Sequence, residues 1–256
     1  AQPHYAGCSK IIPIKNPRDK FRKVEKMNSE PRVQSEGGFM LDLIREIADG
    51  KAAPAAFQRP FVWSKDDVEA FWESILRGYP LGSFLLWRPI DPGINGRDML
   101  GPIKFQKEAR SALILDGQNR LVTIAWSMTD IDAQDFPPNS PGIDLFAKDD
   151  RLIADPYVRK VHFVAADKVE KMMMPIHYLF DGLNEFFRRQ WSNNQDDGAM
   201  KWLDDLAYKL RQARIVRTTI EDATAEEARD AFLHISRAGV PMSAEDFDNA
   251  LKFGIS

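Results

Sequence analysis

The stretch LILDGQNRLVTIAW, residues 113 to 126, changes character at its centre. Its first residues continue a short apolar run that is typical of a buried strand and that ends at Asp116-Gly117. The apolar residues that follow recur at helical spacing, so we expect a helix from Gln118 to Met128. The sequence therefore predicts a strand that leads directly into the N-terminus of a helix.

The residues at this helix entrance are polar and suit an anion. The first N–H groups of a helix have no partner within it, and the helix dipole adds positive potential there. Arg120 is expected to bind a phosphate, and Gln118 and Asn119 to contact a sugar or a base. Asp116 repels a phosphate unless a cation lies between them, which predicts Mg²⁺, or it holds a ribose hydroxyl or a water molecule. The simpler alternative is an aspartate that shapes a turn and an arginine in a surface ion pair.

A second polar pair, Gln58-Arg59, lies in an extended segment before a predicted helix that Ser64 caps. Three aromatic residues flank the pair: Phe57, Phe61 and Trp63. Because Arg59 and Arg120 each lie at a helix entrance, we hypothesise that folding brings both guanidinium groups to one phosphate chain.

Composition excludes several classes of protein. The chain has 256 residues, a formal net charge of −3, and 44% hydrophobic and 29% charged residues. No apolar run approaches the roughly 20 residues that cross a bilayer, and the N-terminal residues lack the apolar centre of a signal peptide. The single cysteine, Cys8, cannot form an internal disulfide, so we expect a cytoplasmic protein without membrane contact.

Other common catalytic motifs are missing from the sequence. The four histidines lack the spacing of a zinc site, and there is no P-loop or nucleophile elbow. Between Lys15 and Arg32, seven basic residues stand against three acidic ones. This basic segment is interpreted as a solvated arm, with local nucleic-acid binding as the alternative.

The pattern of short strands among more numerous helices predicts an α+β fold. Expected helices cover residues 40–48, 65–77, 118–128, most of 175–212, 225–237 and a last one from Ser243, and expected strands cover 81–87, 111–115 and 214–221. A hairpin is expected over residues 143–154, with its turn at Lys148 to Asp150.

Three stretches carry a family resemblance: FQRPFVWSKDDVEAFWESILRGYPLGSFLLW at 57–87, LILDGQNRLVTIAW at 113–126, and EEARDAFLHISRAGVPMSAEDFDNAL at 226–251. Together they resemble the N-terminal domain of the GmrSD-type modification-dependent restriction proteins, also found in SspE-like antiphage proteins. The resemblance covers roughly residues 38–253. It implies a ParB/sulfiredoxin-like small sheet core with a large helical portion. The implied domains are a basic arm at 1–37, a core with both motifs at 38–130, and a hairpin and helical portion at 131–256 that packs on the core.

The resemblance also implies a function and site residues. Such domains bind and often hydrolyse a nucleotide, sense modified or foreign DNA, and control a nuclease. The family's QR pair corresponds to Gln58 and Arg59, and its DGQQR motif to Asp116, Gly117, Gln118, Asn119 and Arg120. Asn119 stands where glutamine is usual and Ser236 where asparagine is usual. These two departures indicate either an altered nucleotide preference or binding without turnover.

The favoured hypothesis is an NTPase switch that requires Mg²⁺. Arg59 and Arg120 hold phosphates, Asp116 positions the metal or a water molecule, and Gln118 orients the nucleotide or the attacking water. An HNH-type nuclease is expected on a partner subunit or a further domain, and the isolated chain is expected not to cleave DNA. The alternatives are a nucleotide-independent reader of modified DNA, to which the aromatic residues contribute stacking contacts, and a scaffold that docks a nuclease. The sequence leaves open the oligomeric state.

Overall fold

The computed structural model describes residues 31–56, 60–90, 96–104, 111–133, 135–190 and 196–236. They belong to a compact unit that begins at Pro31. Its helices are α2 (Met40–Ala48), α3 (Lys65–Leu76), α4 (Gln118–Ser127), α5 (Ile143–Phe146), α6 (Tyr178–Asp181), α7 (Leu183–Gln190), α8 (Asp197–Arg211) and α9 (Ala225–Ser236). Its strands are β1 (Arg32–Phe39), β2 (Ala52–Pro54), β3 (Ser83–Pro89), β4 (Met99–Leu100), β5 (Ile103–Lys104), β6 (Ala112–Asp116), β7 (Asp150–Asp155), β8 (Lys160–Ala165), β9 (Met174–Pro175) and β10 (Arg214–Ala223). A short 3₁₀ helix covers Ala166–Lys168.

A mixed five-stranded sheet, in the order β1-β10-β3-β6-β2, forms the centre of the unit. β1 is antiparallel to β10 and β3 is antiparallel to β6, whereas β10 and β3 run parallel, as do β2 and β6. The α+β fold class is therefore confirmed. Residues 32–37, which the sequence placed in the N-terminal arm, form most of β1, and this strand pairs with β10 from the far end of the chain.

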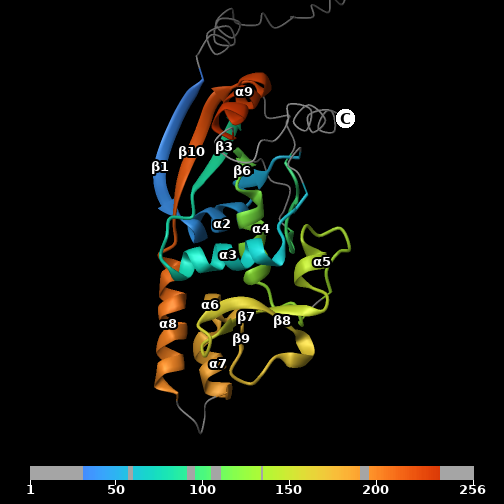
Figure 1. Cartoon of the computed structure of the whole chain (residues 1–256). Coiled ribbons are helices and arrows are strands. Elements are labelled where there is room, and N and C mark those ends of the chain that lie inside the picture. The colour runs from blue at the N-terminus through green and yellow to red at the C-terminus, as the bar shows by residue number, and fades with distance from the viewer. Residues whose placement is uncertain are drawn as a thin grey trace, which may run out of the picture. The chain divides into compact units, whose positions relative to one another are not determined.

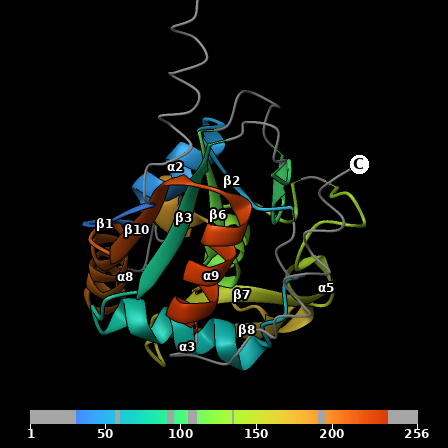
Figure 2. The same cartoon turned by 90° about the horizontal axis from the view of Figure 1, so that it is seen from above.

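Side chains alternate between the two faces of this sheet, as the period of a strand requires. Phe84 and Leu86 of β3 join a core that also contains α2, α3 and α4, whereas Leu85 and Trp87 join a core with Ala228 and Phe232 of α9. Figures 1 and 2 show α9 against one face of the sheet and α2 and α4 against the other. The central strands β3 and β6 are thus covered on both faces, whereas most of the edge strand β1 is exposed.

A second sheet of three strands, β8-β7-β9, lies on the other side of α3 (Figure 1). The sequence predicted its hairpin at the wrong place. Residues 143–146 form α5, which starts after Gly142, and the turn between β7 and β8 covers residues 156–159. The Asp155 carboxylate accepts the N–H groups of Tyr157 and Val158 at 2.9 and 3.3 Å, and this local bonding fixes the turn.

Side chains cap two helix starts, and the cap at Ser64 confirms the prediction. Ser64 and Asp67 form a capping box at α3, in which the Ser64 N–H donates to the Asp67 carboxylate at 2.8 Å. At α9 the Thr224 N–H donates to the Glu227 carboxylate at 2.7 Å. The helix predicted from Ser243 lies outside the described residues. No helix in the described part of the chain combines the length and the apolar character needed to cross a membrane.

Candidate functional site

At the turn between β6 and α4, the first backbone N–H groups of the helix have no partner among the described residues, as expected. Gly117 caps the helix in the left-handed conformation, with φ of 99°, and no side chain caps it. The first bond of the helix runs from the Leu121 N–H to the Gly117 carbonyl at 3.1 Å. Between described residues, no hydrogen bond uses the N–H of Gln118, Asn119 or Arg120. The positive end of α4 therefore has donors available for an anion.

Gly117 lies against the ring of Phe84 on the neighbouring strand β3. A Cβ atom at position 117 would come within 2.2 Å of Phe84 Cδ1, far inside van der Waals contact. The absence of a side chain therefore lets the turn pack directly on the sheet, and the left-handed φ is one that glycine adopts without strain.

Arg120 points back to the sheet and contacts β3 and the residues before it. Its Nη1 donates to the Leu81 carbonyl at 2.6 Å and its Nη2 to the Ser83 carbonyl at 2.7 Å. Its guanidinium carbon lies 4.3 Å from the centre of the Phe84 ring. Burial lowers the pKa of Arg120, and the Asp116 carboxylate, 3.6 Å from Nη2, opposes that shift. Arg120 is thus a partly buried cation that fixes the first turn of α4 to β3.

The Asp116 side chain is 51% exposed at the end of β6, so its carboxylate remains accessible beside the helix entrance. The described residues contain no group of three or more His, Cys, Asp or Glu side chains arranged to hold a metal ion. A single accessible carboxylate fits Mg²⁺, which proteins bind through one or two carboxylates together with substrate phosphates and water. It does not fit a metal that needs a complete set of protein ligands.

Gln118 is the least expected member of the turn because its side chain is buried. The residue is 6% exposed, and its Oε1 has no hydrogen-bond donor among the described residues. A buried amide oxygen without a donor costs free energy, about 1–3 kcal/mol in general. A buried polar group in this state requires an explanation, such as strain, a catalytic role, or a bound water or ion.

Asn119 connects this turn to the segment that follows the Gln58-Arg59 pair. Its Oδ1 accepts the Val62 N–H at 3.3 Å. The structure therefore brings the two motif regions together at this point, although Phe57, Gln58 and Arg59 themselves lie outside the described residues. The convergence of Arg59 and Arg120 on one anion stays a prediction.

A cleft of about 510 Å³ opens beside Val62. It contains Phe61 and Trp63, two of the three aromatic residues selected from the sequence. Sequence reasoning missed its other wall, which includes Asn139 and Ser140, because residues 130–142 contain no recognisable motif. The remaining lining residues are Pro60, Arg97, Pro138, Pro141, Gly142, Ile143, Asp144 and Leu145.

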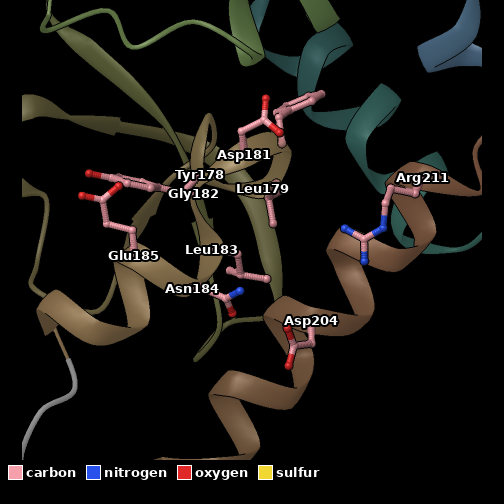
Figure 3. Close-up of a pocket in the computed structure, with 10 residues that line it drawn as sticks. Tyr178, Leu179, Asp181, Gly182, Leu183, Asn184, Glu185, Asp204 and Arg211 are labelled. Atoms are coloured by element: carbon pink, nitrogen blue, oxygen red, sulfur yellow. The ribbon is translucent and has the colours of Figure 1, made fainter.

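A separate hollow of about 580 Å³ lies between α6, the start of α7, and α8. Figure 3 shows Asp204 and Arg211 on α8, with Leu183 and Asn184 across from them. No buried polar atom that lacks a hydrogen bond, among the described residues, belongs to its lining. None of the residues of the two sequence motifs lines this hollow, so we propose no site there.

Together, the fold and the turn define an α+β domain with an anion-receptive helix entrance and a neighbouring aromatic cleft. The chain belongs to the family described as the GmrSD restriction endonuclease N-terminal domain, whose model matches residues 40–253. This match confirms the resemblance drawn from the sequence. An uncharacterized protein of Methanocaldococcus jannaschii is 32% identical over 109 residues, which are 40% of this chain. The chain spans only 17% of that relative's length.

Proposed function

We propose that this domain binds the phosphate chain of a nucleoside triphosphate with Mg²⁺ at the β6–α4 turn, hydrolyses it, and thereby controls a partner nuclease that acts on modified or foreign DNA. The observation that carries the proposal is the buried Gln118 Oε1, which has no hydrogen-bond donor among the described residues. It lies at a helix entrance whose first backbone N–H groups also have no partner among those residues. A restriction-system family fits this role.

The chemistry of each group indicates its role in nucleotide binding and hydrolysis. The N–H groups of Gln118, Asn119 and Arg120 donate to phosphate oxygens. Asp116 holds Mg²⁺, which neutralises phosphate charge when it is bound. Gln118 Oε1 is an acceptor and is repelled by phosphate oxygens, so the group that meets it is a donor: the attacking water or a ribose hydroxyl. Gln118 thus orients a water molecule or the nucleotide.

The proposal is tested by replacing Gln118 with methionine, which has a similar shape and no amide oxygen. We expect phosphate release from the best nucleotide to fall by about 100-fold, within the usual range for a group that acts on a proton in the reaction. We also expect the unfolding temperature to stay the same or rise, because the substitution removes a buried acceptor without a donor. Released phosphate and thermal unfolding measure the two effects.

The matched control is Gln34→Met, at an exposed position of β1, which should retain wild-type turnover. Equal phosphate release by Gln118→Met and Gln34→Met would remove Gln118 from the site. If the wild-type chain releases no phosphate from any nucleoside triphosphate with Mg²⁺, with or without DNA, the hydrolysis proposal is wrong.

A further inference from the structure

The aromatic cleft beside Val62 has the features of a built ligand site. One wall is the segment 60–63, and the other is formed by residues 138–142 and the first turn of α5. Its volume, about 510 Å³, lies within the usual range of small-molecule sites, about 300–1,000 Å³. Val62 belongs to this cleft and donates its N–H to Asn119, so the cleft adjoins the β6–α4 turn.

The walls of the cleft are held in place by aromatic packing. The ring centres of Phe61 and Phe146 lie 5.8 Å apart, and Phe146 stacks on Trp126 at 5.7 Å with an angle of 8° between the ring planes. Trp126 Nε1 donates to the Pro141 carbonyl at 2.6 Å. Gly142 has φ of 85°, and a Cβ there would lie 3.0 Å from Trp126 Nε1. The cleft is therefore preformed by contacts that the ligand does not have to make.

A polar group in the lining lacks a partner. Ser140 is 3% exposed, and its Oγ makes no hydrogen bond within the described part of the chain. A hydroxyl both donates and accepts, so it matches the mixed edge of a heteroaromatic ring. Phe61, Trp63 and three prolines supply flat apolar surface around it. A planar ring with polar atoms on its edge fits this combination better than a flexible or fully charged ligand.

We propose that this cleft binds a nucleobase, with Ser140 bonding the edge of the ring and the aromatic side chains contacting its face. This inference rests on the proposed function of the neighbouring turn, where the phosphates of the same nucleotide bind. Aromatic contact of this kind is worth about 1–3 kcal/mol per base in general and tolerates different bases. The base comes from a free nucleotide or from an extruded base of DNA, and the two sources are distinguished by experiment.

The test compares equilibrium binding of three probes to the whole chain in the presence of Mg²⁺: a nucleoside triphosphate, inorganic tripolyphosphate and a single-stranded oligonucleotide. Ser140→Ala is expected to weaken binding of the nucleoside triphosphate by about tenfold, the usual effect of one lost hydrogen bond of about 1.4 kcal/mol. Binding of tripolyphosphate, which has no base, should be unchanged. The unfolding temperature should not fall, because the hydroxyl has no partner in the described structure.

A second variant fills the cleft with a bulky side chain, and its control places the same side chain elsewhere. Asn139 is exposed, so Asn139→Trp introduces a large ring at the wall of the cleft with little risk to folding. Gln34→Trp, at an exposed position of β1 outside the cleft, is the matched control. We expect Asn139→Trp to weaken binding of the nucleoside triphosphate by at least about tenfold and to leave tripolyphosphate binding unchanged. Gln34→Trp should bind both probes like the wild type.

The outcomes separate the two proposals. If the nucleoside triphosphate and tripolyphosphate bind equally well to all variants, the base site is wrong while the phosphate site stands. If only the oligonucleotide binds, and Ser140→Ala or Asn139→Trp weakens it, the base comes from DNA and nucleotide hydrolysis is wrong. If no probe binds to the wild-type chain, both proposals are overturned.

Discussion

Replacing Gly117 with alanine is expected to lower the free energy of unfolding by about 2–5 kcal/mol. Two costs add: a non-glycine residue in the left-handed region, about 1–2 kcal/mol, and overpacking of about 1–3 kcal/mol. The second arises because the new Cβ would lie 2.2 Å from Phe84 Cδ1, and Phe84 is itself fully buried. In a domain of this size the unfolding temperature should fall by roughly 10 °C. Urea and thermal unfolding measure the change.

The matched control is Gly37→Ala in β1. A Cβ at this position meets no atom within 4 Å, so we expect a change within about 0.5 kcal/mol. If Gly117→Ala is as stable as Gly37→Ala, the close packing of the turn on β3 is wrong. A stable Gly117→Ala would also remove the reason why the N–H groups of α4 point where they do, because that direction depends on the left-handed cap.

The elements around the site could be predicted because their signals are local. An apolar run that ends in Asp-Gly, followed by residues at helical spacing, is sufficient to locate β6 and α4. Ser64, the predicted cap of α3, and Thr224 each lie three residues before an acidic residue, and both form capping boxes. Because these signals depend only on residues close together in the chain, they can be recognised without knowledge of the rest of the fold.

The arrangement of the sheet could not be predicted in the same way. β1 pairs with β10 although Arg32 and its partner Glu221 are remote in sequence. Strand order of this kind depends on which apolar faces meet in the folded chain, and no local pattern records it. The hairpin error has a local cause: the polar run Lys148 to Asp150 resembles a turn, whereas the bonds to the Asp155 carboxylate place the turn later.

For the site, too, local features could be predicted and features that depend on long-range packing could not. The sequence selected the five residues of the DGQNR turn and two of the aromatic residues of the cleft. It could not show that Gln118 Oε1 and Ser140 Oγ are buried without a partner among the described residues, because both properties depend on packing by distant segments. It also did not predict the partners of Arg120, because Leu81 and Ser83 approach it only after β3 has paired with β6.

These partners change what an Arg120 variant measures. We expect Arg120→Ala to lower the free energy of unfolding by about 3 kcal/mol, because hydrogen bonds to a charged group are worth about 1.5–3 kcal/mol each and part of the guanidinium is exposed to solvent. The Arg120 side chain is 19% exposed. Its two hydrogen bonds satisfy the Leu81 and Ser83 carbonyl groups, which would lose this donor in the variant. Arg45→Ala is the control, because that side chain is 73% exposed and pairs only with Asp42 among the described residues. It should change the free energy by less than about 0.5 kcal/mol.

Loss of phosphate release by Arg120→Ala therefore does not by itself place Arg120 on a phosphate. The informative quantity is the additional stabilisation that a saturating nucleotide with Mg²⁺ gives each variant, since a ligand raises stability only through its affinity for the folded state. We expect this increment to be smaller for Arg120→Ala than for Arg45→Ala, because the Arg120 guanidinium lies 3.6 Å from the Asp116 carboxylate, at the proposed phosphate and Mg²⁺ site. An increment equal to that of Arg45→Ala would contradict this expectation. Arg120 would then act only by fixing α4 to β3, and the phosphates would be held by the backbone of the turn and by Arg59.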